Sequence, residues 1–196
     1  MHTIKQRRLF TKREYNILDN KLHYKTSYIG GEAEGVVAFE NLTKEKVTHK
    51  TTNPVLLVIA FLILGMAGIS FILRNEKDAD PDMWIVFSFM SIVMLSVYLM
   101  MNENSWKIKT HNGGYLYLFK KKPNEKIVDG FIETLFSERD NYLIDRYLNF
   151  DPNLNEIQAN DLKWLLNVEA ISKKEFDRYY LDLKLLYAPK NGNIGF

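Results

Sequence analysis

Two uncharged apolar runs of nineteen residues each constrain this chain more than any other feature of its sequence. Residues 55–73 read VLLVIAFLILGMAGISFIL, and residues 83–101 read MWIVFSFMSIVMLSVYLMM. At about 1.5 Å of rise per residue, each run makes a helix of about 28 Å, close to the hydrocarbon thickness of a bilayer. A buried hairpin in a large soluble core is the alternative, but two consecutive runs of spanning length disfavour it. The sequence therefore predicts two transmembrane helices, in segments 53–73 and 83–102.

The charges that flank these runs predict their orientation. Residues 1–54 hold ten Lys and Arg against six Asp and Glu, whereas the short segment 74–82 holds two against four. Basic flanks stay on the cytoplasmic side of a membrane. We therefore expect a multi-pass protein with both termini in the cytoplasm and an external acidic loop at 74–82.

Lysines near the predicted helices are candidates for contact with anionic lipid headgroups, each contributing about 1 kcal/mol close to the surface. These candidates are Lys44, Lys46, Lys50, Lys107, Lys109, Lys120, Lys121 and Lys122. For Lys120–Lys122 an ordinary solvated hairpin edge, kept from pairing with other edges by its charge, is an equal alternative. Trp84 and Trp106 would mark the outer and inner membrane interfaces.

Small residues punctuate both apolar runs and allow close helix contact in lipid. Gly65, Gly68, Ser88 and Ser91 are the candidates, with the two helices packing on each other or on another subunit. Neither run contains an ionisable residue, which disfavours a transporter built on these helices alone.

The residues outside the membrane segments predict a small β domain in two halves, 1–52 and 103–150. Residues 14–18 and 21–28 read as strands joined by a turn at Asp19-Asn20, a glycine-flanked loop follows at 30–35, and residues 36–39 and 46–51 read as further strands. Residues 106–110 and 115–119 alternate around Asn112-Gly113-Gly114 and predict a hairpin. We expect one antiparallel sheet or small barrel assembled from both halves, with the membrane hairpin inserted between two strands.

The C-terminal third has helical periodicity. An apolar stripe from about residue 125 to residue 147 predicts a helix that caps the sheet. Segment 151–188 predicts a helical hairpin whose second helix begins at the capping box Ser172-Lys173-Lys174-Glu175, and residues 189–196 form a flexible tail. An isolated helical hairpin cannot bury both its faces, so its side chains are candidates for partner binding. These candidates are Trp164, Leu165, Phe176, Tyr179 and Tyr180.

Two resemblances rest on these segments. The hairpin LYLFKKKPN followed by the helix FIETLFSERDNYL resembles a bacterial pleckstrin-homology-like (PH-like) domain, over about residues 10–50 and 106–148. The segment LKWLLNVEAISKKEF, residues 162–176, is similar to the SHOCT (short C-terminal) helical hairpin, although Val168-Glu169 stand where that family has glycine. Both resemblances imply association and scaffolding and not catalysis. With the two predicted transmembrane helices, we expect the protein in a bacterial inner membrane.

Composition and motifs point away from catalysis. The chain has no cysteine, its four histidines lack metal-ligand spacing, and its net charge is only +2. We therefore predict no catalytic residue, cofactor, metal or nucleic-acid partner. The fold class predicted is an α+β membrane protein, and the function predicted is a non-enzymatic, membrane-anchored scaffold or accessory subunit. Its partners are the bilayer, with anionic headgroups, and a protein or a second copy; the alternative is an oligomeric channel lined by Ser88, Ser91 and Ser96.

Overall fold

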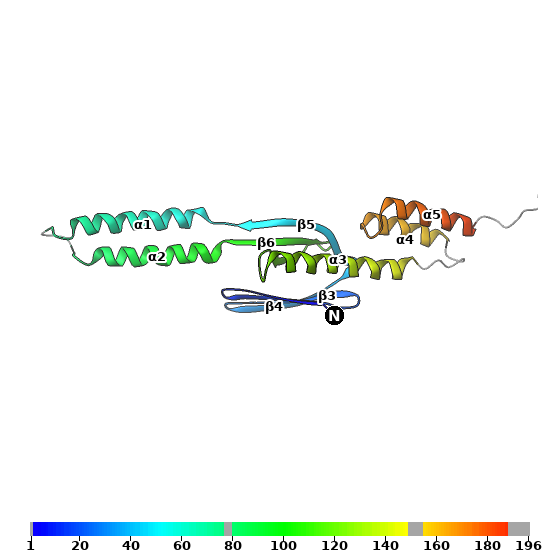
Figure 1. The fold of residues 1–196 in the computed structure, drawn as a ribbon, viewed down its shortest axis with the longest axis horizontal. Helices are drawn as coiled ribbons and strands as arrows, with labels where there is room; N and C mark the ends of the chain where they lie inside the picture. Colours follow the sequence, from blue (N-terminus) through cyan, green and yellow to red (C-terminus); the bar gives the residue numbers. More distant parts are fainter. Residues whose placement is uncertain (1, 77–79, 149–154, 188–196) are drawn as a thin grey trace, which may run out of the picture. The chain divides into compact units, whose positions relative to one another are not determined.

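A computed structural model describes residues 2–76, 80–148 and 155–187 of the chain (Figure 1). The chain divides into two compact units, one of residues 1–47 and 106–196 and the other of residues 48–105. We call them the β-domain unit and the hairpin unit and treat each by itself. The predicted flexible tail, residues 189–196, lies outside the described residues.

The first sheet is a four-stranded antiparallel meander in the β-domain unit. Its strands are β1 (His2–Arg8), β2 (Thr11–Ile17), β3 (Lys21–Tyr28) and β4 (Gly31–Ala38), in that order. Strand β1 is not predicted from the sequence, because only Ile4 and Gln6 of this polar segment turn inward. The prediction of a loop at residues 30–35 is wrong. Gly31 and Gly35 are strand residues that pair with Tyr28 and Tyr24, whose rings cover them.

The second sheet combines strands that precede and follow the two apolar helices in the chain. Its order is β5 (Leu42–Thr51), β6 (Glu103–Thr110) and β7 (Tyr115–Phe119). The predicted hairpin of β6 and β7 is confirmed, but the prediction of a single sheet is wrong, because β1–β4 and β5–β7 form two separate sheets. A short 3-10 turn, η1 (Phe39–Asn41), separates them. It takes Phe39 out of the predicted strand and buries it completely, so the chain changes sheet at a core residue.

Both sheets and one helix share a single hydrophobic core. Helix α3 (Glu125–Tyr147) begins at Asn124, whose side chain accepts from the Ile127 N–H at 2.9 Å. The core joins side chains of both sheets and of this helix: Ile4, Tyr15, Ile17, Leu22, Phe39, Leu42, Ile108, Leu116, Leu118, Val128, Phe131, Ile132 and Leu135. The predicted α+β class, with a helix after the last hairpin, is therefore confirmed.

Helices α4 (Asn155–Asn167) and α5 (Lys173–Tyr187) form the predicted C-terminal pair. The capping box at the start of α5 is confirmed. The Ser172 N–H donates to the Glu175 carboxylate at 2.8 Å, and the Ser172 hydroxyl accepts from the Glu175 N–H at 3.3 Å. A second apolar cluster, separate from the first, joins this pair to the C-terminal half of α3.

The hairpin unit contains α1 (Pro54–Leu73) and α2 (Met83–Met101), which pack on each other. Both are long and apolar enough to cross a membrane, and only 11% and 6% of their most apolar windows are buried. The core helix of a soluble protein would be mostly buried. Asn53 caps α1, its side chain accepting from the Val55 N–H at 3.2 Å.

The two helices of this unit contact each other through small side chains. Ala60, Ala67 and Ser91 are buried, and the Ser91 hydroxyl donates to the Ala60 carbonyl at 2.9 Å. Ser88 is half-buried, and Ser96 donates to the Ile92 carbonyl of its own helix. Gly65 and Gly68, by contrast, are exposed, with open space where a Cβ would stand. This hairpin therefore does not use the two glycines to pack its own helices.

Candidate functional site

Two turns at one end of the first sheet expose large apolar side chains. Arg8 pairs with Thr11 across the first turn and Tyr28 with Gly31 across the second, and Lys12 pairs with Ser27 between them. The apolar side chains are Leu9, Phe10, Tyr28 and Ile29, which are 51%, 58%, 52% and 72% exposed. Together with Arg7, Lys12 and Ser27 they line one surface hollow of about 360 Å³. We call these four residues the apolar tip.

Leu9 occupies its turn position under backbone strain. Its φ of +47° lies in the left-handed region, which costs a residue with a Cβ about 1–2 kcal/mol. Glycine or asparagine is the usual choice there. Leu9 is not a member of the hydrophobic core, so core packing does not compensate for this strain.

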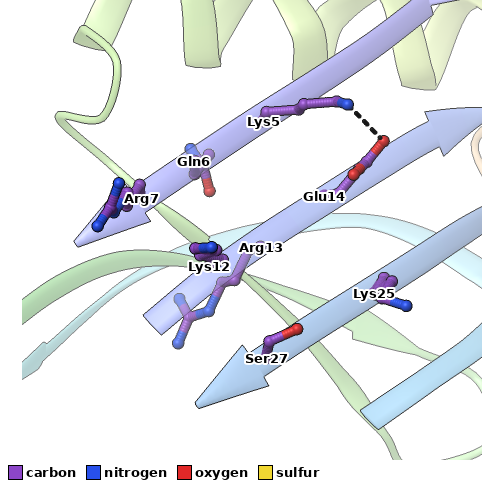
Figure 2. A pocket seen from close by; sticks show the side chains of 8 residues that line it. All are labelled: Lys5, Gln6, Arg7, Lys12, Arg13, Glu14, Lys25 and Ser27. Carbon is purple, nitrogen blue, oxygen red and sulfur yellow. Dashed lines mark ion pairs between the residues drawn. The ribbon is translucent and has the colours of Figure 1, made fainter. Parts of the chain in front are cut away.

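Basic side chains surround the base of the apolar tip. A second hollow of about 330 Å³ is lined by Lys5, Gln6, Arg7, Lys12, Arg13, Glu14, Lys25 and Ser27. Figure 2 shows that these residues come from β1, β2 and β3, with Lys5 reaching across to Glu14. Five cations against one carboxylate give this hollow a positive field that would attract anions.

Not all five cations are free to meet an anion. Lys5 pairs with Glu14 at 3.3 Å, and Lys25 pairs with Glu32 at 2.5 Å and with Glu34 at 3.5 Å. Hydrogen bonding from Lys25 lowers the pKa of Glu32, so this pair is charged at neutral pH. These two lysines are therefore largely neutralised within the sheet.

Arg13 donates to the Tyr117 carbonyl at 3.1 Å. Arg7 and Lys12 are the two cations that remain. They face each other directly across β1 and β2, and both are exposed. Neither has an ion pair or hydrogen bond from its side chain within residues 2–76, 80–148 and 155–187. Like charges opposite each other destabilise a sheet. An anion bound between Arg7 and Lys12 would remove that repulsion. This pair is therefore the part of the hollow that would bind a phosphate or carboxylate most strongly.

The sheet end that carries the tip is joined to the end of β7. The Gln6 carboxamide donates to the Phe119 carbonyl at 2.9 Å and to the Lys122 carbonyl at 2.6 Å. The Arg13 guanidinium lies 4.0 Å from the centre of the Phe119 ring. The apolar tip, the basic hollow and the lysines at 120–122 therefore belong to one end of the β-domain unit.

Trp106 lies at this same end. The amines of Lys46 and Lys120 stand 4.1 Å and 4.2 Å from its ring centre, and they pair with Asp129 and Glu125 at the start of α3. Val47 is the last residue of the β-domain unit before the apolar helices, and Trp106 is the first after them. The boundary between the two units therefore falls within β5 and β6, the strands that carry Lys46 and Trp106.

The other lysines predicted to face the membrane are placed differently. Lys121 and Lys122 are exposed, as is Lys50 in the hairpin unit. Lys107 stacks on Tyr115 with 3.5 Å between its amine and the ring centre, and Lys109 pairs with Glu45 at 3.2 Å. Lys44 is held by Asp140 at 2.5 Å instead of pointing into solvent. In the hairpin unit Trp84 packs edge-on against Phe71, with 5.4 Å between ring centres.

The predicted partner-binding residues divide into buried and exposed sets. Leu165 is fully buried in the cluster beneath α4, and Trp164 packs on Tyr147 of α3 with 4.8 Å between ring centres. Leu165 is therefore a core residue in this structure and not a contact surface. Phe176 and Tyr180 stack with 5.7 Å between ring centres on α5, where they and Tyr179 are half-buried.

The apolar tip, Arg7 and Lys12 are not among the site residues predicted from the sequence. A sequence pattern that could have identified the tip is present, because Arg7-Arg8-Leu9-Phe10 and Tyr28-Ile29-Gly30 place apolar residues where turns normally hold polar ones.

Among the described residues no group of three or more His, Cys, Asp and Glu side chains could hold a metal ion. Comparison with protein-family models, curated proteins and solved structures finds no match to this chain.

Proposed function

We propose that this chain is a non-enzymatic, membrane-anchored interaction module of a bacterial inner membrane. In this proposal α1 and α2 span the bilayer with both termini in the cytoplasm, and the β domain contacts the inner leaflet. The order of four strands, three strands and a helix around one core supports a PH-like assignment for that domain. The C-terminal helices are the part that meets a protein partner or a second copy.

The observation that carries the proposal is the apolar tip with its free cations. Four large apolar side chains stand exposed on two adjacent turns, one of them on a strained backbone, above the unpaired Arg7 and Lys12. Apolar residues that enter the headgroup region beside cations that meet anionic lipid are the two components of peripheral membrane binding. Complete burial of one such side chain is worth about 1.5–3 kcal/mol, and each cation near the surface adds about 1 kcal/mol.

In this proposal the apolar helices attach the chain to the membrane, and the contact of the apolar tip with lipid is a second attachment. The β-domain unit is joined to the apolar helices by the chain on both sides, through β5 and β6. Tethering raises the effective concentration of the tip near lipid, so weak contacts suffice.

The test uses the full-length protein reconstituted in vesicles. Because the chain contains no cysteine, Phe10→Cys or Ile29→Cys takes a single environment-sensitive fluorophore. Asn20→Cys, in the turn at the opposite end of the sheet, is the matched control. In vesicles with phosphatidylglycerol we expect quenching by nitroxide-labelled lipids at positions 10 and 29 and little at position 20.

The role of charge is tested with the same labels. Arg7→Glu with Lys12→Glu should abolish the quenching at position 10, as should high salt, whereas Lys21→Glu at the other end should not. Equal quenching at positions 10 and 20 in anionic vesicles would contradict the proposed lipid contact of the β domain.

The proposed role of the C-terminal helices is tested separately. Affinity purification from native membranes in mild detergent should return a stoichiometric partner or a defined oligomer. That species should be lost in the Phe176→Ala, Tyr180→Ala variant.

A further inference from the structure

The C-terminal pair α4–α5, which we call the arm, is attached to α3 by its own apolar cluster. This cluster and the β-domain core have no buried residue in common, and the half-buried Tyr142 of α3 packs against both. It contains Leu143 of α3, Leu162 and Leu165 of α4, Ile171 of the intervening turn and Leu183 of α5. The arm is therefore a separate packing unit laid on one half of a helix, the kind of element that can open without unfolding the rest.

Two cations hold the turn between the helices of the arm. The Arg139 guanidinium, 0% exposed, donates to the Val168 carbonyl at 2.9 Å. The amine of Lys44 donates to the next carbonyl, that of Glu169, at 2.6 Å. Asp140 binds both cations, at 2.8 Å from Arg139 and 2.5 Å from Lys44. We call Arg139, Asp140 and Lys44 the latch, because they connect α3 and β5 to the arm through main-chain carbonyls.

Several contacts at the latch cost free energy when the arm is packed on α3. The Nε of Arg139 is buried and has no hydrogen-bond partner, and burial lowers the pKa of this arginine. A buried cation that lacks one of its hydrogen bonds is costly. Glu169 has a φ of +59°, a conformation that favours glycine. Among the described residues Leu9 is the only other non-glycine residue with a positive φ. The two strained positions therefore lie in the apolar tip and in the turn that the latch holds.

We propose that the arm is releasable, and that the latch of Arg139, Asp140 and Lys44 sets the balance between its closed and open states. In the closed state the faces of Leu143 and Leu165 cover each other. Opening the latch exposes both faces while the β-domain core stays folded, because no buried residue belongs to both apolar clusters. The use of these faces for a protein partner rests on the proposed function; release itself does not.

Release is measured by amide hydrogen exchange on the full-length protein in mild detergent. Lys44→Met removes the contacts to Glu169 and Asp140 while keeping an apolar stem of similar length. Lys109→Met is the matched control, since Lys109 lies on neighbouring β6 and pairs only with Glu45. Losing a charge-assisted hydrogen bond should speed exchange in α4 and α5 on the order of five- to tenfold. Exchange in β2 and β3 should stay unchanged, and Lys109→Met should change neither.

A second variant should favour the closed state of the arm. Glu169→Gly removes the Cβ from the left-handed position and should slow exchange in the arm by a few-fold. A third carries Tyr147→Cys with Trp164→Cys, whose parent rings are in contact, joined by a short bismaleimide. This link should abolish the effect of Lys44→Met.

The results separate the possible failures. Arm exchange that is unaffected by Lys44→Met, or that rises together with exchange in β2 and β3, would overturn the releasable arm. Faster arm exchange without any change in co-purifying protein would leave the release standing and contradict only the partner role in the proposed function.

Discussion

Gln6 and Phe119 are paired as if they were neighbours in one sheet, although they belong to different sheets. The Gln6 carboxamide donates to the Phe119 carbonyl at 2.9 Å and accepts from the Phe119 N–H at 2.9 Å. A side-chain amide here imitates a backbone peptide group and satisfies the free edge of β7. This link joins β1 to β7 beside the basic hollow, so one buried glutamine couples the fold to the geometry of the candidate site.

Replacing Gln6 should destabilise the β domain. Gln6→Leu keeps the side-chain bulk but leaves two buried polar groups of Phe119 unpaired, at a cost of about 2–4 kcal/mol. Thermal unfolding of the full-length protein in mild detergent, followed by circular dichroism, measures the loss. Thr3→Ala on the same strand breaks only an exposed hydrogen bond to Asn16 and should stay within about 0.5 kcal/mol. Equal effects of the two changes would contradict the structural role of Gln6.

Replacing Leu9 should stabilise the fold and weaken the membrane contact. Leu9→Asn relieves the left-handed strain at φ +47° and should raise the free energy of unfolding by about 1 kcal/mol. The same change removes an apolar side chain from the tip, so lipid quenching of a label at position 29 should fall. Phe10→Asn, where φ is not positive, should lower the quenching without any gain in stability. A destabilised Leu9→Asn protein would show that the leucine is needed by the fold.

The hairpin of α1 and α2 should depend on one serine and not on its glycines. Ser91→Ala removes the hydrogen bond to the Ala60 carbonyl between the two helices and should cost about 0.6 kcal/mol, and at most about 1.7. Ser96→Ala loses only a bond within α2, and Gly65→Ala places a methyl group in open space. Both should leave the hairpin unchanged. Titration of the full-length protein with a denaturing detergent compares the three, and a Gly65→Ala loss equal to that of Ser91→Ala would contradict the packing.

The start of α5 should respond to acid. Hydrogen bonds from the Ser172 hydroxyl and N–H hold the pKa of Glu175 below its ordinary value of 4.5. A carboxylate with a lowered folded pKa stabilises the folded state above its unfolded pKa and loses that contribution as the pH falls through the folded value. Ser172→Ala should therefore speed amide exchange in α5 several-fold at pH 7, and the difference from the parent should shrink below about pH 4.5. Asp177→Asn, which breaks only the exposed pair with Lys173, is the control.

Prediction from sequence succeeded where a local pattern has one physical outcome. The apolar runs, the alternation around Asn112-Gly113-Gly114 and the Ser172–Glu175 box each depend on residues close together in the chain, and the structure has the corresponding helices, hairpin and cap. Prediction failed for β1 and for the first half of β4, because a polar edge strand and a glycine-rich strand lack the alternation that identifies strands. In β4 the missing bulk is provided by Tyr24 and Tyr28 across the strand, which no local pattern reveals.

The sequence by itself determined the element types and the spanning length of the two apolar helices, because hydrophobic periodicity and capping act within a few residues. Only the tertiary structure decided the division into two sheets, the joining of β1 to β7 through Gln6, and the identity of the unpaired cations. Arg7 and Lys12 look no different in sequence from Lys5 and Lys25 or from Lys44. Strand register gives Lys5 and Lys25 carboxylate partners and sets Arg7 opposite Lys12, and packing brings Lys44 to the arm. The free energy of a surface charge depends on its nearest neighbours in space, and those are set by the fold.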